Sequence, residues 1–235
     1  MNLPSPLLEA TFLRRYKRFL ADFSTQEGEE ITAHCANSGS MLGLLHVGEK
    51  AMLSHATTPG RKLAYTWELA KDHDHWVGIH TGRTNSLVRE ALEQGILAEL
   101  KDYGTIQQEV TAVPHSRLDF CLSQEGLPPC HMEVKSVTLR QDEIALFPDA
   151  VTTRGKRHLE VLATLRQQGG RSVLLFVVQR EDCRLFRPAA AIDGAYAATL
   201  RQVAAAGVEV LVYACSVTPQ AITLNHALPF ELEAA

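Results

Sequence analysis

The chain has 235 residues, of which 46% are hydrophobic and 21% are charged, and this composition excludes disordered and fibrous classes. The longest apolar run, residues 173–178, is far shorter than the ~20 residues of a membrane span, and the N-terminus does not resemble a secretory signal. We therefore expect a cytoplasmic protein with no membrane association. The formal net charge of −4 repels polyanions, so any nucleic-acid site must be a local basic patch.

The five cysteines are widely spread and form no C-x-x-C pair, which indicates reduced and mostly buried thiols. The first 80 residues are expected to form short strands separated by turns. Residues 11–23 and 30–35 are expected to pair as a hairpin across Gln26-Glu27-Gly28. Further strands are expected within residues 46–53, 63–69 and 76–80. Many short strands favour a small β-barrel.

From residue 81 the hydrophobic spacing becomes that of an α/β module. A helix capped by Thr84 or Asn85 is expected to extend to Leu100. It is followed by expected strands over residues 108–113, 117–122 and 131–139, a helix over 153–168, a buried strand over 172–178, a helix over 194–206 and a strand over 208–214. We therefore predict two domains, residues 1–80 and residues 81–235.

A carboxylate and an ammonium group are predicted to share one face of the strand over residues 131–139. Glu133 and Lys135 point to the same side, while Val134 points to the opposite, buried side. Asp119 lies in the preceding strand and can approach Glu133 if the register allows. Two carboxylates and a lysine suit a site for Mg²⁺ or Mn²⁺ and phosphodiester hydrolysis.

An E-x-K triplet alone is more often a solvated ion pair, and Glu99-Leu100-Lys101 is a second example in this chain. The position of Glu133-Val134-Lys135, after an aspartate-bearing strand and before a helix and a buried strand, favours a metal-dependent nuclease core.

Two basic segments are candidates for phosphate contacts. The first contains Arg14, Arg15, Lys17 and Arg18 with interleaved aromatic residues, as expected for a strand that binds nucleic acid, and its alternative is a solvated edge strand. The second places Arg154, Lys156 and Arg157 in the first turns of a helix, where a bound phosphate would relieve the charge repulsion. Its alternative is a solvated helix start capped by Asp149 or Thr152. An Asx-type turn explains Asn37.

Four segments together resemble the sugar fermentation stimulation protein A family, from about Leu13 to the C-terminus. They are residues 34–41 (HCANSGSM), 116–120 (SRLDF), 133–139 (EVKSVTL) and 147–159 (FPDAVTTRGKRHL). The resemblance implies an α/β (α+β) two-domain fold. In this fold a small OB-like β-barrel that binds nucleic acid is followed by a PD-(D/E)xK restriction-endonuclease-like core with a mixed central sheet flanked by helices.

On this resemblance the nuclease motif falls on Asp119, Glu133 and Lys135. Glu90, on the helix before the sheet, and Glu109, in its first strand, are further carboxylate candidates. The departures from the family pattern are Ala36 in place of a proline and Ser38 in place of a threonine, and neither touches this motif.

Two functions stay open on the sequence. The first is a DNA-binding protein with a Mg²⁺ (or Mn²⁺) nuclease site, in which Asp119, Glu133 and the Val134 carbonyl hold the metal and Lys135 orients the attacking water. The second is a non-enzymatic DNA-binding regulator of sugar-utilisation genes, in which Lys135 only neutralises Glu133. RNA as a partner and a homodimer are both left open. A small-molecule enzyme has little support, because the chain has no Gly-rich phosphate loop and no nucleophile motif.

Overall fold

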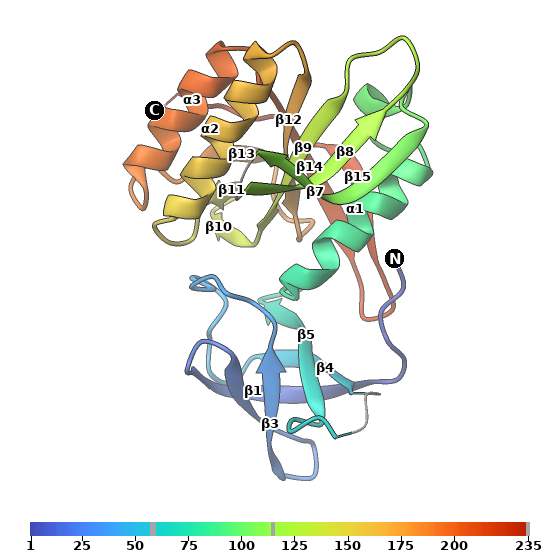
Figure 1. The fold of residues 1–235 in the computed structure, drawn as a ribbon. Helices are drawn as coiled ribbons and strands as arrows, with labels where there is room; N and C mark the ends of the chain where they lie inside the picture. Colours follow the sequence, from blue (N-terminus) through green and yellow to red (C-terminus); the bar gives the residue numbers. More distant parts are fainter. Residues whose placement is uncertain (57–59, 114–115, 234–235) are drawn as a thin grey trace.

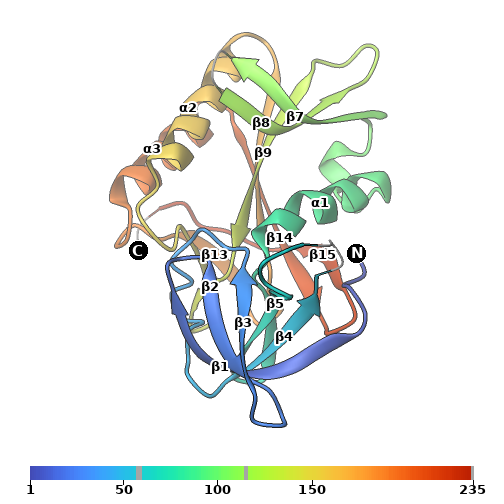
Figure 2. The ribbon, with the colours of Figure 1, turned by 60° about the horizontal axis from the view of Figure 1, so that its bottom comes forward.

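Five strands of the N-terminal half close into a barrel. The computed structural model describes residues 1–56, 60–113 and 116–233. The strands of this half are β1 (Leu7–Tyr16), β2 (Leu20–Ser24), β3 (Glu30–Cys35), β4 (Lys50–His55), β5 (Tyr65–Asp72) and β6 (His75–Gly78). They form a sheet in the order β3-β2-β1-β4-β5-β6, and β3 also pairs with β5, which closes the barrel (Figure 2). Phe12, Phe23 and Trp67 fill its interior, with ring centroids 5.1–5.8 Å apart.

The segment 11–23 is not one strand, as the sequence predicted, but two strands joined by a sharp turn. Lys17 and Arg18 adopt φ values of 47° and 64°, and Tyr16 then pairs with Leu20. Such a turn is normally marked by Gly or Asn, so a pair of basic residues gave no local indication of it. The predicted hairpin to residues 30–35 is confirmed for β2 and β3. As a consequence, Lys17 and Arg18 lie at the tip of a hairpin instead of alternating along a strand.

The second half is a six-stranded mixed sheet with helices on both faces (Figure 1). Its strands, in spatial order, are β15 (Ile222–Ala227), β14 (Glu209–Val217), β12 (Arg171–Val178), β9 (Cys130–Val137), β8 (Ser116–Ser123) and β7 (Thr105–Val113). Within β12, Val173, Leu175 and Val177 join the core on the side of α1 (Thr84–Glu93). The intervening residues of β12 join the core under α2 (Thr153–Gln167) and α3 (Gly194–Ala205). The two-domain fold class predicted from the sequence is confirmed.

Several boundaries differ from the sequence prediction. The helix predicted to reach Leu100 ends at Glu93, because Gly95 has a φ of 69°, and two short 3-10 helices, η1 (Thr81–Arg83) and η2 (Ala98–Leu100), flank it. No side-chain cap forms at the start of α1, so Thr84 and Asn85 are not its caps. The strand β15 and a small sheet were not predicted. That small sheet contains β10 (Leu139–Gln141), β11 (Ile144–Phe147) and β13 (Leu185–Pro188).

All five cysteines are unpaired, and four of them are buried, as the sequence predicted. No helix within the described ranges has the length and apolar character needed to cross a membrane.

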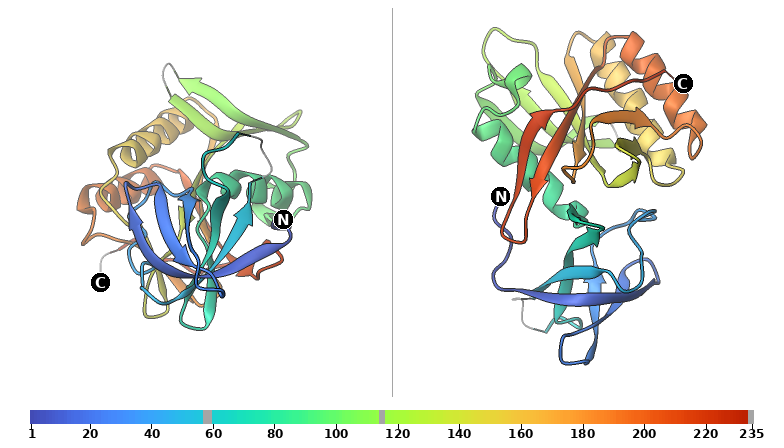
Figure 3. Two further views of the ribbon diagram at one scale, coloured as in Figure 1. Left: turned by 90° about the horizontal axis from the view of Figure 1, so that it is seen from below. Right: turned by 180° about the vertical axis from the view of Figure 1, so that it is seen from behind.

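Buried ion pairs join the two domains. Arg180, two residues after β12 and 1% exposed, donates from Nη2 to Oδ2 of Asp72 in β5 at 2.6 Å and from Nε to Oδ1 of Asp182 at 2.6 Å. Glu68 in β5 is also 1% exposed and accepts from Nε and Nη2 of Arg83 at 2.7 Å each. The N-terminus lies beside the β14–β15 hairpin (Figure 3, right), where Asn2 forms a bridge with Ala221. These contacts fix the barrel against the second domain.

Acidification is expected to weaken this junction at Glu68. Burial raises the pKa of Glu68, but hydrogen bonds from Arg83 and Ser54 outweigh it, so the pKa lies below its usual value of 4.5. A lowered folded-state pKa stabilises the fold above the unfolded pKa, and this contribution is lost as pH falls through the folded value. The free energy of unfolding should therefore fall as pH drops below about 4.5, and Glu68→Gln should show a smaller fall. Equal pH dependence of the two proteins in denaturant titrations would contradict this assignment.

Candidate metal and nucleic-acid site

A cavity of about 370 Å³ lies where the two domains meet. The barrel contributes the loop after β3, and the second domain contributes the start of α1, parts of β8 and β9, and the segment between β11 and α2. The polar side chains on its wall include Asn37, Thr84, Asn85, Asp119 and Lys135. The cavity therefore needs both domains for its walls.

Glu133 and Lys135 of β9 lie on one face of the strand and contact each other. Lys135 Nζ donates to Glu133 Oε1 at 2.6 Å, and His158 Nδ1 of α2 contacts the same oxygen. Glu133 is 4% exposed. Burial raises the pKa of Glu133, but the hydrogen bonds and charges of His158 and Lys135 outweigh it and lower the pKa. Glu133 is thus held as a carboxylate inside the domain, while Val134 packs into the core on the α1 side.

Asp119 of β8 lies beside this pair. Its Oδ2 accepts from the Val134 backbone N at 2.7 Å, and its Oδ1 accepts from Asn85 Nδ2 at 2.8 Å. The antiparallel register, in which Phe120 pairs with Met132, places it there. Burial, and then the negative charge of Glu133, raise the pKa of Asp119. The negative charge of Glu133 therefore reaches Asp119, which is the one of these two carboxylates that lines the cavity among the described residues.

The residues at this point fit a divalent cation. Glu133 Oε2 is buried and has no hydrogen-bond partner among the described residues, which is costly unless a positive group uses it. Asp119 and Val134 line the cavity, so a carboxylate and a strand backbone are both available there. Within residues 1–56, 60–113 and 116–233, no group of three or more His, Cys, Asp or Glu side chains is placed to hold a metal. A cation here would depend on two carboxylates, a backbone carbonyl, water and substrate oxygens, as Mg²⁺ sites commonly do.

Two carboxylates proposed from the sequence lie elsewhere. Glu90, in the second half of α1, accepts from the α-ammonium group of Met1 at 2.6 Å. Glu109 is exposed on β7 and has a φ of 54°. Neither lines the cavity as the described residues form it. Asn37 does line it and forms the expected Asx turn, because its Oδ1 accepts from the Gly39 N at 2.8 Å.

Of the four basic residues proposed for the barrel, two are held by hydrogen bonds or an ion pair within the protein and two are exposed at a hairpin tip. The Arg15 guanidinium donates to the carbonyl oxygens of Arg18, Asn37, Gly39 and Ser40, so it fastens the loop after β3 and is not free for phosphate. Arg14 is exposed but paired with Asp22 at 2.7 Å. Lys17 and Arg18 are exposed at the hairpin tip.

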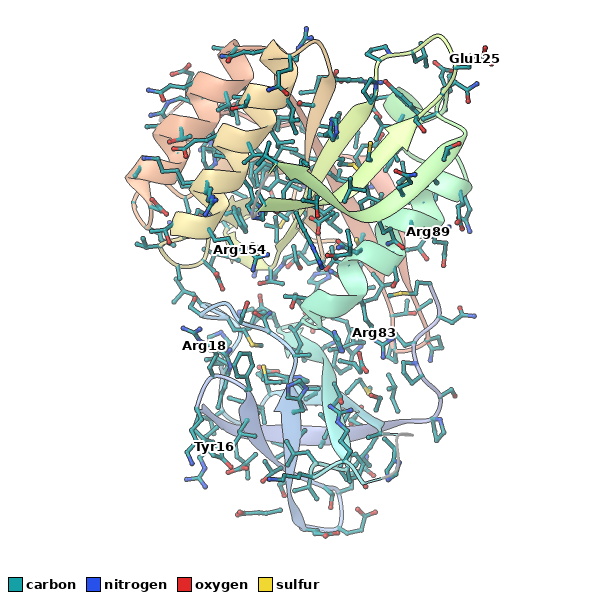
Figure 4. The ribbon with its side chains drawn as sticks, viewed as in Figure 1. Tyr16, Arg18, Arg83, Arg89, Glu125 and Arg154 are labelled. Atoms are coloured by element: carbon teal, nitrogen blue, oxygen red, sulfur yellow. The ribbon has the colours of Figure 1, made fainter. Side chains whose placement is uncertain are left out.

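At the start of α2 the structure places Arg154, Lys156 and Arg157 on the surface. Thr152 caps this helix by accepting from the Gly155 N at 3.0 Å, one of the two caps considered from the sequence. Figure 4 shows Arg18 and Arg154 on the same side of the molecule, one on each side of the junction between the domains. Arg154 also shares a shallow depression with Arg117 of β8.

The loop after β3 is hydrogen-bonded to the second domain. Ser40 Oγ donates to the Asp149 carbonyl oxygen at 2.6 Å, and the Met41 N donates to Asp149 Oδ2 at 2.9 Å. A Cβ atom on Gly39 would meet Asp149 Oδ2 at 2.6 Å, so any larger residue there would displace the Asp149 carboxylate from its contact with Met41. This wall of the cavity therefore consists of direct contact between the domains.

Sequence reasoning missed His158, the role of Asn85, and the contact of Asp149. His158 shares one face of α2 with the buried Leu162 and Leu165, and a histidine on an apolar stripe was the available indication. Tyr196 of α3 was also missed. Its buried hydroxyl has no partner in the described part of the chain, and burial, followed by the charges of Glu133 and Asp193, raises its pKa. His158 and Tyr196 show that α2 and α3 complete the surroundings of Glu133.

Comparison with known proteins assigns both halves of the chain to one family. The model of the sugar fermentation stimulation protein RE domain matches residues 82–221, and the model of the SfsA N-terminal OB domain matches residues 13–79. The chain belongs to the sugar fermentation stimulation protein family. A family member from Geotalea uraniireducens is 51% identical over 228 residues, covering 97% of this chain and 98% of the relative. Another from Magnetococcus marinus is 49% identical over 232 residues, covering 99% and 100%.

A solved structure of the same family shares the fold. It is described as the structure of Pyrococcus furiosus SfsA in complex with Ca²⁺, and it superposes with a TM-score of 0.88 at 27% sequence identity. The match covers 98% of each chain. The family likeness therefore extends over both domains of the sugar fermentation stimulation protein fold.

Proposed function

We propose that this family member is a cytoplasmic DNA-binding phosphodiesterase that uses Mg²⁺ or Mn²⁺. The observation that carries the proposal is the placement of Asp119 and Lys135 on the wall of a cavity between the domains, with the buried Glu133 hydrogen-bonded to Lys135 and one Glu133 carboxylate oxygen unpartnered among the described residues. The Ca²⁺ named for the Pyrococcus furiosus relative supports a divalent cation in this fold. Exposed cations on both domains support a polyanionic partner.

Asp119, Glu133 and the Val134 carbonyl would hold the cation. When bound, the cation would polarise a phosphoryl oxygen and lower the pKa of a water molecule. The chain's own groups prepare the site for this. Asn85 fixes the orientation of Asp119, and His158 fixes that of Glu133, by the hydrogen bonds described above. The Lys135 ammonium group can orient the attacking water or stabilise the negative charge that develops on the phosphate.

One observation favours a second candidate, a DNA-binding regulator without catalysis. Glu133 is not among the described residues that line the cavity, and its Oε1 is already neutralised by Lys135 at 2.6 Å. In this function the E-x-K triplet is a structural ion pair. The second triplet of the chain shows that the pattern can serve structure alone, because the Glu99 side chain accepts from the Tyr213 hydroxyl at 2.8 Å and forms no ion pair with Lys101 in the described part of the chain.

The two functions separate in a cleavage assay with end-labelled single- and double-stranded DNA and Mg²⁺ or Mn²⁺. If Lys135 acts in hydrolysis, Lys135→Ala should lower the cleavage rate by about 10²–10⁴-fold while it still binds DNA. The matched control is Lys101→Ala, which removes the exposed lysine of the other triplet and should cleave like the wild type. Binding by all three proteins with no cleavage of any substrate would instead support the regulator.

A further inference from the structure

The tip of the β1–β2 hairpin carries an aromatic side chain that the proposed site does not use. Phe19 is 44% exposed and follows two exposed cations, Lys17 and Arg18, in the chain. One face of its ring stacks on His34 of β3, with ring centroids 6.3 Å apart and planes 25° apart. The ring thus lies nearly parallel to His34 while much of its surface stays open.

This aromatic tip is fastened to the cavity wall. The Cys35 N donates to the Phe19 carbonyl oxygen at 2.9 Å, which attaches the tip to the end of β3. Arg15 bridges the Arg18 carbonyl oxygen, at 2.8 Å, to that of Asn37, also at 2.8 Å. Asn37 is itself a wall residue of the cavity. A ligand on Phe19 therefore has a fixed position relative to the cavity.

The surroundings of Phe19 are positively charged. Lys17 and Arg18 are exposed next to it in the chain. Arg61 lies near enough to His34 for its charge to add to the effect of burial in lowering the His34 pKa. Arg154 faces the same side from the second domain (Figure 4). An aromatic platform surrounded by cations is the arrangement that proteins use to stack the bases of single strands and bind their phosphates.

The size and the closed walls of the cavity also favour a single-stranded ligand. Its volume of about 370 Å³ is in the range of small-ligand pockets, roughly 300–1,000 Å³, and is too small for a duplex. The contacts of Ser40 and Met41 with Asp149 close one wall, and the ion pairs of Asp72 and Glu68 oppose separation of the domains. A phosphodiester bond reaches Asp119 more easily from an unpaired strand than from a rigid duplex.

We propose that the ligand of this site is a single-stranded segment of nucleic acid, of which one base stacks on Phe19 while the strand continues into the cavity. The inference rests on the proposed nucleic-acid function and adds the strandedness of the substrate and the residue that selects it. Arg18 and Arg154 contact the phosphates on either side of the junction. A fully paired duplex lacks the free base that Phe19 requires.

The test is binding of labelled oligonucleotides by fluorescence anisotropy in EDTA at one fixed salt concentration, so that cleavage plays no part. A single strand should bind at least about tenfold more tightly than a blunt duplex of the same length. Phe19→Leu should weaken single-strand binding about tenfold or more and leave duplex binding unchanged, whereas Phe19→Trp should retain it. The matched control is Phe230→Leu, because Phe230 is 40% exposed in a segment paired with β13, away from the barrel. Thermal unfolding of each variant checks that the fold is retained.

The outcomes separate this inference from the proposed function. Equal binding of single strand and duplex, or an unchanged affinity in Phe19→Leu, would overturn the inference and leave a nucleic-acid-binding phosphodiesterase standing. A loss of single-strand affinity in Phe230→Leu equal to the loss in Phe19→Leu would also overturn the inference. Failure of the wild type to bind any nucleic acid would overturn both. Loss of cleavage in Lys135→Ala, with unchanged strand preference, would leave the inference intact.

Discussion

Replacing Glu133 with glutamine is expected to lower the affinity for Mn²⁺ by at least about 10–100-fold and to abolish metal-dependent cleavage. Replacing a residue that only hydrogen-bonds to a metal ligand already lowers metal affinity or activity by about 10–100-fold, so replacing a ligand should lower it by at least that much. The amide keeps the size and one acceptor of the side chain but not its charge, and Glu133 is 4% exposed, so solvent cannot replace the lost charge. Calorimetric titration with Mn²⁺ and a cleavage assay on the same preparation measure the two effects.

The control for this experiment is Glu143→Gln. Glu143 is 61% exposed and pairs with Arg184 on the surface, so its loss should change neither metal affinity nor cleavage. Cleavage by Glu133→Gln at the wild-type rate would remove Glu133 from the metal site. The Lys135–Glu133 contact would then be structural in a protein that still cleaves, and the cation would have to bind elsewhere.

Replacing Arg180 with alanine is expected to destabilise the protein by about 3–5 kcal/mol. The side chain is 1% exposed, and its removal leaves the buried carboxylates of Asp72 and Asp182 without their main partner. The Arg140 guanidinium lies 3.1 Å from Asp182 Oδ2 and 3.6 Å from Asp72 Oδ2. Its positive charge compensates only part of the lost ion pairing. Urea unfolding followed by circular dichroism gives the free energy directly.

An exposed arginine pair supplies the comparison. Arg184 is 81% exposed in its contact with Glu143, so Arg184→Ala should change the free energy of unfolding by no more than about 1 kcal/mol. A similarly small change in Arg180→Ala would mean that the domain junction does not depend on this ion pair. The second domain would then hold the barrel mainly by backbone contacts such as that of the Gly78 N with the Gln179 carbonyl oxygen, at 2.9 Å.

The parts of the structure that depend on short-range periodicity were accessible from the sequence. The period of two residues in β9 placed Glu133 and Lys135 together and Val134 in the core, and the buried strand β12 followed from its apolar run. A small β-barrel followed by an α/β module was expected from such patterns, whereas the OB-like character of the barrel and the mixed sheet were expected from the family resemblance.

Other parts depend on contacts that leave no local pattern. Asp149 was considered as a helix cap, but its carboxylate accepts from Met41, 108 positions away in the chain. The hydrogen bonds of Arg15 to four carbonyl oxygens depend on the turn at Lys17. The positive φ of Lys17 could not be predicted, because lysine rarely adopts it. Arg15, which the sequence assigned to phosphate binding, for this reason holds the loop that forms one wall of the cavity.

The contact between the loop after β3 and Asp149 has a consequence for how the chain folds. Ser40 and Asp149 are 109 positions apart, and Asp72 and Arg180 are 108 apart, so these contacts close long loops at an entropic cost. Asp119, Glu133 and Lys135 belong to adjacent strands of one sheet, but the walls of the cavity beside them come from both domains. An incompletely folded or truncated chain would therefore carry Asp119, Glu133 and Lys135 without the surrounding walls, and any substrate selectivity of the proposed site would belong only to the fully folded, two-domain molecule.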